Sequence, residues 1–167
     1  MTNENHMHGI LRKQGWFKTN ELSIVKVSED ISCSEPFYAK IQSFQKNSVL
    51  LADKIVFKNV AYNCDGHSCV LIHQNESKSE FSFGLPIKFL VKKSVQGELE
   101  VNILYQATNH DYLENFGLFK IEPTEQFRIV NINSLATFSP LNLYTANPLS
   151  KESFTATSLR NKPILFP

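Results

Sequence analysis

The chain has 167 residues and a mass of 19.1 kDa, which is the size of a single domain. Hydrophobic residues make up 42% and charged residues 20%, so the composition provides a core and excludes wholesale disorder. The net charge of +1 argues against a dedicated nucleic-acid binder, because such proteins usually carry a larger basic excess.

The predicted elements begin after a flexible N-terminal arm at residues 1–20, where the sequence shows no sustained periodicity. From Ser23 to Ile132 apolar and polar residues alternate with a period close to two, which predicts strands. Lys46-Asn47 and Asp65-Gly66 are expected to form hairpin turns, and Asp-Gly between alternating runs is one of the stronger hairpin signals. The strands predicted in this half are Ser23–Ser28, Phe37–Phe44, Val49–Ala52, Ile55–Tyr62 and Cys69–His73.

In the second half, Gln96-Gly97 and Pro123 mark expected turns, and the polar stretch Ala107–Glu114 is expected to be a loop or one short helical turn. Asn133–Pro140 is expected to contain a turn of helix. The strands and extended stretches predicted here are Phe81–Phe83, Ile87–Val91, Glu98–Tyr105, Gly117–Ile121, Phe127–Ile132 and Leu141–Tyr144.

Some nine or ten short strands, spaced by turn signals, predict an all-β fold: a small, partly open barrel or sandwich of short antiparallel strands, with at most one or two short helical turns. The 13 Phe and 5 Tyr support this, because aromatic side chains fit a pleated surface. The alternative is an α+β domain with a helix in Asp111–Phe116 or Asn133–Phe138. We expect one β domain at residues 21–145 and an extended C-terminal tail at residues 146–167.

No apolar run approaches the roughly 20 residues that are needed to span a membrane, and Met1–Gly9 has no apolar segment of the signal-peptide type. The cysteines Cys33, Cys64 and Cys69 are odd in number, which favours a reducing compartment over a disulfide scaffold. We therefore expect no membrane partner and an intracellular location, in the cytoplasm or nucleus, provided that no signal precedes the chain.

The densest group of metal-ligating side chains is Cys64, His67, Cys69 and His73. Thiolates and imidazoles are zinc ligands, but the common modules place a second pair roughly a dozen residues after the first. On a single strand, Cys69 and His73 would lie about 13 Å apart at about 3.3 Å per residue. We therefore predict a reduced hairpin tip without a structural metal, and a small zinc-binding module at residues 64–73 is the alternative.

The sequence contains no recognisable catalytic or cofactor-binding constellation: it has no Gly-rich phosphate loop, nucleophile elbow or metalloprotease helix. A Cys64 or Cys69 nucleophile with His67 lacks a third group to orient the base. This favours a non-catalytic interaction module without a cofactor, whose partner is a protein segment or a nucleic acid. The alternative is an enzyme assembled from distant residues, such as His110 with Asp111 and a remote nucleophile. The oligomeric state stays open.

Aromatic side chains are the candidates for a binding surface, since exposed rings near Lys or Arg can stack bases or hold a peptide. Most of them must belong to the core of a domain of this size. The candidates by residue type are Phe37, Tyr38, Phe44, Phe57, Tyr62, Phe81, Phe83 and Phe89.

Three islands carry a family resemblance: Pro36-Phe37-Tyr38-Ala39-Lys40-Ile41, Asp65-Gly66-His67, and Leu135–Tyr144 with its Ser139-Pro140-Leu141-Asn142-Leu143-Tyr144 end. Their order and separation resemble a C-terminal β domain of uncharacterised, transposon-derived animal proteins, and the first island resembles the opening strand of bromo-adjacent-homology domains. The chain departs from the pattern after His67, where Ser68-Cys69 replaces a second histidine and an aromatic residue. The resemblance implies a β fold and a mobile-element or chromatin context, and no activity.

Overall fold

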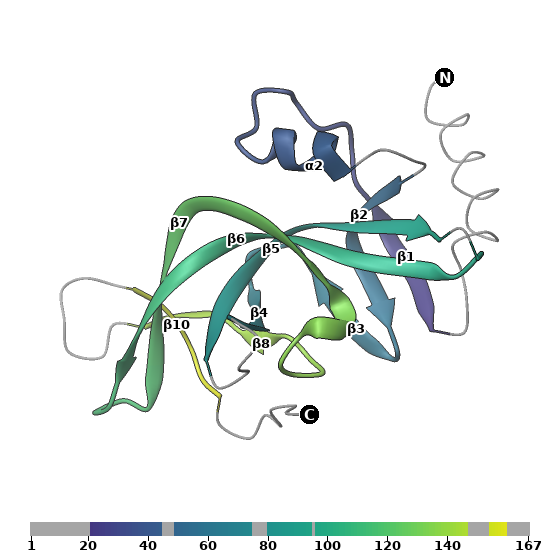
Figure 1. Ribbon diagram of the computed structural model, residues 1–167. Coiled ribbons are helices and arrows are strands. Elements are labelled where there is room, and N and C mark those ends of the chain that lie inside the picture. The colour runs from purple at the N-terminus through teal and green to yellow at the C-terminus, as the bar shows by residue number, and fades with distance from the viewer. Residues whose placement is uncertain (1–20, 45–48, 75–79, 95, 147–153, 160–167) are drawn as a thin grey trace.

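The computed structural model describes residues 21–44, 49–74, 80–94, 96–146 and 154–159 (Figure 1). Its strands belong to one antiparallel sheet in the order β1-β2-β5-β6-β7-β10-β9, with β3 on β2 and with β4 joining β5 to β8. The all-β prediction is therefore confirmed, and the sheet is not closed. The elements are β1 (Leu22–Val27), α2 (Tyr38–Phe44), β2 (Val49–Phe57), β3 (Val60–Asn63), β4 (Ser68–His73), β5 (Phe81–Lys93), β6 (Leu99–Leu113), β7 (Leu118–Asn131), η1 (Ile132–Ser134), β8 (Leu141–Asn142), β9 (Tyr144–Ala146) and β10 (Phe154–Thr157).

Three long strands, β5, β6 and β7, form the spine of the sheet and curve across the molecule (Figure 1). The strands predicted at Phe81–Phe83 and Ile87–Val91 are parts of the single strand β5, and those predicted at Gly117–Ile121 and Phe127–Ile132 merge in β7. Pro86 and Pro123 lie at irregularities of the ladders and do not end these strands. Such positions tolerate proline, which has no N–H to donate, and they bend a strand. The loop or short helical turn predicted at Ala107–Glu114 is wrong, since residues 107–113 continue β6 and residues 108–113 pair with β7.

The two faces of the spine carry separate hydrophobic clusters. On the first face, Val101, Ile103 and Tyr105 of β6 belong to the largest cluster, together with residues of β1–β5 and η1. On the second face, Leu104 packs under α2, and further along Phe83 and Ile121 pack with Leu141 of β8. We call residues 141–146 the strap, because they pair with β4 through β8 and with β10 through β9 and so cross the second face.

The strand predicted at Phe37–Phe44 is wrong, because residues 38–44 form the helix α2. Phe37, Ile41 and Phe44 follow the helical spacing i, i+4, i+7, which places all three on one stripe. That stripe packs against Leu90 and Leu104 on the second face. Burial of the stripe outweighs the alternation that the same residues also show.

Turns account for the other local differences. Ile55–Tyr62 is not one strand, since Lys58 and Asn59 adopt positive φ angles of 50° and 66° and turn β2 into β3. Asp65-Gly66 does not close a hairpin, because β3 pairs with β2 whereas β4 pairs with β5 and β8. The Gln96-Gly97 turn between β5 and β6 and the helical turn after residue 131 are confirmed.

At the C-terminal end, the sheet continues past residue 145, because β10 lies between β7 and β9 and buries Ala156 and Thr157. The remainder of the expected tail, the expected N-terminal arm at residues 1–20 and the Lys46-Asn47 turn lie outside the described residues. Among the described ranges, no helix has the length and hydropathy that crossing a membrane requires.

Candidate binding groove

The sheet has a gap beside β5. This strand pairs with β4 through residues 81–84 and with β2 through residues 89–92. Between the two ladders, residues 85–88 have no strand partner on this edge within the described part of the chain. The gap exists because the chain turns away after β3 and reaches β4 through a corner at residues 64–67. Cys64 N donates to the Asp53 carbonyl at 3.0 Å and holds the corner against β2.

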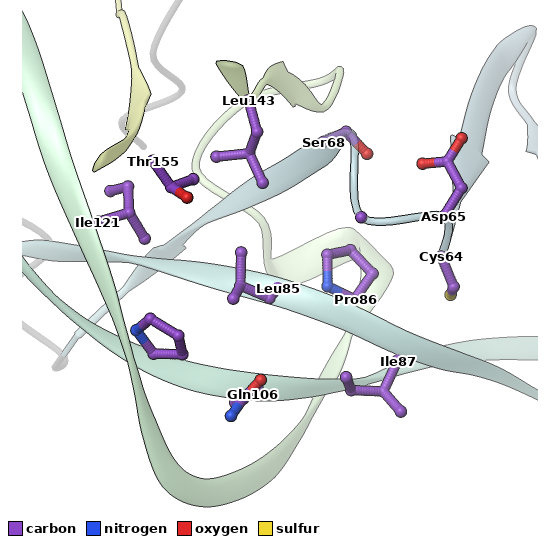
Figure 2. A pocket seen from close by; sticks show the side chains of 12 residues that line it. Cys64, Asp65, Ser68, Leu85, Pro86, Ile87, Gln106, Ile121, Leu143 and Thr155 are labelled. Atoms are coloured by element: carbon purple, nitrogen blue, oxygen red, sulfur yellow. The ribbon is translucent and has the colours of Figure 1, made fainter. Parts of the chain in front are cut away.

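A groove of about 390 Å³ lies at this gap, on the second face of the spine. Leu143 of the strap lines the groove. Cys64, Asp65 and Ser68 lie at one end of the groove and Ile121 and Thr155 at the other (Figure 2). The lining residues are Cys64, Asp65, Gly66, Ser68, Leu85, Pro86, Ile87, Gln106, Ile121, Pro123, Leu143 and Thr155.

An Asx turn shapes the corner at residues 64–67. Asp65 Oδ1 accepts a hydrogen bond from His67 N at 2.9 Å, and Gly66 has a φ of 85°, which glycine adopts without steric cost. Leu143 N donates to the His67 carbonyl at 2.9 Å, so the strap is joined to the corner. The corner therefore holds the Asp65 carboxylate in a defined orientation at the rim.

The wall formed by β6 and β7 is shaped by a bulge. Gln106 pairs with Phe127 and Thr108 pairs with Pro123, so three residues of β7 lie opposite Ala107 alone. Gln106 Nε2 donates to the Thr124 carbonyl at 2.7 Å, and Thr124 Oγ1 donates to the Ala107 carbonyl at 2.8 Å. These bonds satisfy main-chain groups that the bulge leaves out of the ladder.

Among the lining residues that belong to the described part of the chain, Asp65 has the only carboxylate side chain, and none is Lys, Arg or His. Near this end, Lys88 Nζ donates to Asp53 Oδ1 at 2.6 Å, and Ser28 Oγ donates to the same oxygen at 2.7 Å. Burial by itself would raise the pKa of Asp53. The bonds from Lys88 and Ser28 and the positive charges of Lys88 and Lys26 outweigh burial, so the pKa of Asp53 is lowered.

The two thiols near the corner are not activated. Burial raises the pKa of Cys64 well above its ordinary value, and the negative charges of Asp53 and Asp65 raise it further. Burial also raises the pKa of Cys69 to about 12, although a hydrogen bond with Thr157 lowers it. Because the thiolate is the nucleophile, the raised pKa values disfavour nucleophilic chemistry at both cysteines at neutral pH.

The structure separates the four metal-ligand candidates. Cys64 lines the groove and His67 is exposed at the corner, whereas Cys69 is buried in the strap-covered cluster and His73 ends β4 opposite Phe81. Among the described residues, no three His, Cys, Asp or Glu side chains gather so that they could hold a metal ion.

His110 and Asp111 are neighbours in β6, so their side chains point to opposite faces and do not form a dyad. The His110 ring lies edge-on to Phe83, with 5.1 Å between ring centroids, and packs near Phe119. Asp111 is exposed opposite Lys120.

None of the eight aromatic candidates is exposed. Seven of them pack in the three clusters or along their margins, and Tyr38 is half-buried in α2. The described aromatic residues that are exposed instead are Tyr112, Phe116, Phe138 and Tyr144. Sequence reasoning also missed most of the groove. The sequence signal that could have indicated the groove is a proline inside each of two strands, since Pro86 and Pro123 both line the groove.

The chain matches no protein-family model, and no curated protein matches its sequence. The geometry of the groove therefore carries the functional argument.

Proposed function

We propose that the protein is a non-catalytic interaction module that receives a short, extended segment of a partner protein in the groove. The observation that carries this proposal is that an apolar lining coincides with a stretch of β5 that pairs with β6 on one edge and, within the described residues, has no strand partner on the other edge. A bound segment buries apolar side chains against Leu85 and Ile121, and its main chain meets the open edge at residues 85–88. Addition of a strand to an open edge is a common mode of peptide recognition.

The size and chemistry of the groove fit this role. Its volume of about 390 Å³ is within the range of roughly 300–1,000 Å³ that specific ligand sites occupy. Apolar residues from β5, β7 and the strap supply the apolar surface against which a bound segment packs. Ser68, Gln106 and Thr155 supply polar groups that can fix the orientation of the segment's main chain.

A protein segment is favoured over a nucleic acid. Nucleic-acid binding depends on Lys and Arg side chains that neutralise phosphates, and neither residue type is present among the described residues that line the groove. The negative charge of Asp65 repels a phosphate. The enzyme alternative has less support, because the lining places a single carboxylate beside a thiol whose pKa is raised.

The cellular context is a separate part of the proposal. The likeness of the three sequence islands to a transposon-derived β domain places the partner in a mobile-element or chromatin assembly, and this rests on the resemblance alone. Cys33, Cys64 and Cys69 are all free, which supports an intracellular location.

Selection of a displayed random peptide library on the immobilised full chain tests the proposal. Thr155→Trp fills one end of the groove from an exposed strand position that tolerates an aromatic residue. Val25→Trp is the matched control, because Val25 is 53% exposed on β1 and does not line the groove. Selected peptides should bind wild type and the control equally and should bind Thr155→Trp at least about tenfold more weakly, which corresponds to roughly 1.4 kcal/mol.

Far-ultraviolet circular dichroism first establishes that both variants keep the β fold. Enrichment of no peptide, or peptides that bind the folded Thr155→Trp variant as well as wild type, would show that the groove is not the binding site.

A further inference from the structure

The groove has one end that carries the charge of Asp65, and its middle and far end are uncharged. Asp65 lies at the corner end, Leu85 lies in the middle, and Ile121 and Thr155 lie at the far end (Figure 2). A bound segment that lies along the groove therefore meets a carboxylate at one point and an apolar surface at the next. This order indicates which kinds of side chain a bound segment carries.

Within the described residues, no Lys, Arg or His side chain forms an ion pair with Asp65. Lys88 is the nearby ammonium group, and it is bound to Asp53 at 2.6 Å. With side chains 18% and 23% exposed, these two charges form a largely enclosed pair that neutralises itself. The negative charge of Asp65 is felt inside the groove, where it contributes to the raised pKa of Cys64.

The carboxylate of Asp65 also has acceptor capacity to spare. Two carboxylate oxygens offer about four acceptor positions, and the Asx turn uses one of them, on Oδ1. The turn and the bond from Leu143 N to the His67 carbonyl fix the corner, so little conformational entropy is lost when a ligand binds there. A charge held in place at the rim of an apolar groove selects a ligand of opposite charge.

We propose that the segment bound in this groove carries a Lys or Arg that pairs with Asp65, and an apolar residue two positions along the chain, on the same face of the extended segment, that occupies the groove between Leu85 and Ile121. This inference rests on the proposed function and specifies the class of partner: a protein with an exposed basic-apolar motif. An acidic or uncharged apolar segment is discriminated against.

The test uses four pools of acetylated octapeptide amides, random except for one central position that is fixed as Lys, Arg, Gln or Glu. Retention of each pool on the immobilised full chain is measured for wild type, Asp65→Asn and Asp111→Asn. Asp65→Asn keeps the side-chain carbonyl that accepts from His67 N, so the corner is preserved. Asp111→Asn removes an exposed carboxylate outside the groove and is the matched control.

Wild type and the Asp111→Asn control should retain the Lys and Arg pools about two- to fivefold better than the Gln pool, as expected for a partly exposed ion pair, and the Glu pool least. Asp65→Asn should abolish this preference, and so should 0.5 M NaCl, because salt screens an exposed pair. Melting temperatures equal to that of wild type establish that the variants are folded.

The remaining outcomes distinguish the two proposals. Equal retention of the Lys, Arg and Gln pools by wild type, or a cationic preference that persists in Asp65→Asn, would overturn the pairing with Asp65 and leave the groove as a peptide site. If wild type retains no pool above a blank surface, the proposed function fails and the inference fails with it.

Discussion

Gly84 lies where β4, β5 and β6 meet, paired with Val70 on one side and with Ala107 on the other. A Cβ atom at this position would lie 2.7 Å from Ile72 Cδ1 and 2.7 Å from Tyr105 Cδ2, with the ring Cγ at 3.1 Å. Relaxed carbon contacts lie at roughly 3.5–4.0 Å, so both neighbours must move. The Ile72 methyl can rotate, but the Tyr105 ring is buried in the largest cluster and cannot move without displacing others.

The cost of Gly84→Ala follows from two opposing effects. Overpacking of a filled core costs about 1–3 kcal/mol. Loss of the conformational freedom of glycine in the unfolded chain offsets about 0.4–1 kcal/mol of this. We expect a net loss of about 1–2 kcal/mol in the free energy of unfolding. At roughly 2–4 °C per kcal/mol for a chain of this size, the melting temperature should fall by about 2–8 °C.

Urea unfolding followed by circular dichroism measures this effect, and a double-mutant cycle assigns its cause. Ile72→Val removes Cδ1 and should by itself cost about 0.5–1.5 kcal/mol. If the clash is the cause, the double variant should be at least about 0.5 kcal/mol more stable than the sum of the single effects. A Gly84→Ala variant as stable as wild type, or strictly additive effects in the cycle, would refute the reasoning.

The remaining predictions concern the ion pair and the thiols. Asp53→Asn leaves the enclosed Lys88 without its counter-ion, so it should lower the free energy of unfolding at pH 7 by about 1–3 kcal/mol in urea titrations, against little change in an Asp111→Asn control. The folded-state pKa of Asp53 lies below its ordinary 3.8, so its contribution to stability is present above about pH 3.8 and is lost as the pH falls through the folded-state pKa. The difference in unfolding free energy between variant and wild type should therefore shrink in titrations at pH 3. A constant difference would contradict this assignment. A thiol reagent at pH 8 should modify the exposed Cys33 rapidly and Cys64 only after unfolding. Cys33→Ser should therefore abolish the fast phase of the modification. A fast phase that survives in this variant would show that burial does not protect Cys64.

The sequence by itself determined the fold class. A period of two along β6 and β7 is a local property, since neighbouring side chains of a strand point to opposite faces, and it survives whichever strands become partners. Turn chemistry was equally local at Gln96-Gly97, where Gly97 adopts a φ of 86°. These features depend on a few adjacent residues and can be derived without knowledge of the rest of the chain.

Pairing and packing decided what local pattern could not. Residues 37–44 satisfy both a strand and a helix pattern, and the apolar surface around Leu90 and Leu104 selected the helix. Asp65-Gly66 has the chemistry of a hairpin turn, but β4 found its partner in β5, so the turn became a corner.

The groove depends on this choice of partner. Its lining comes from residues between 64 and 155, brought together by two proline-containing irregularities and by the strap. No window of sequence contains these residues together. The charged end and the uncharged end of the groove are therefore properties of the tertiary structure, because only the pairing of distant strands places Asp65 and Ile121 in the same groove.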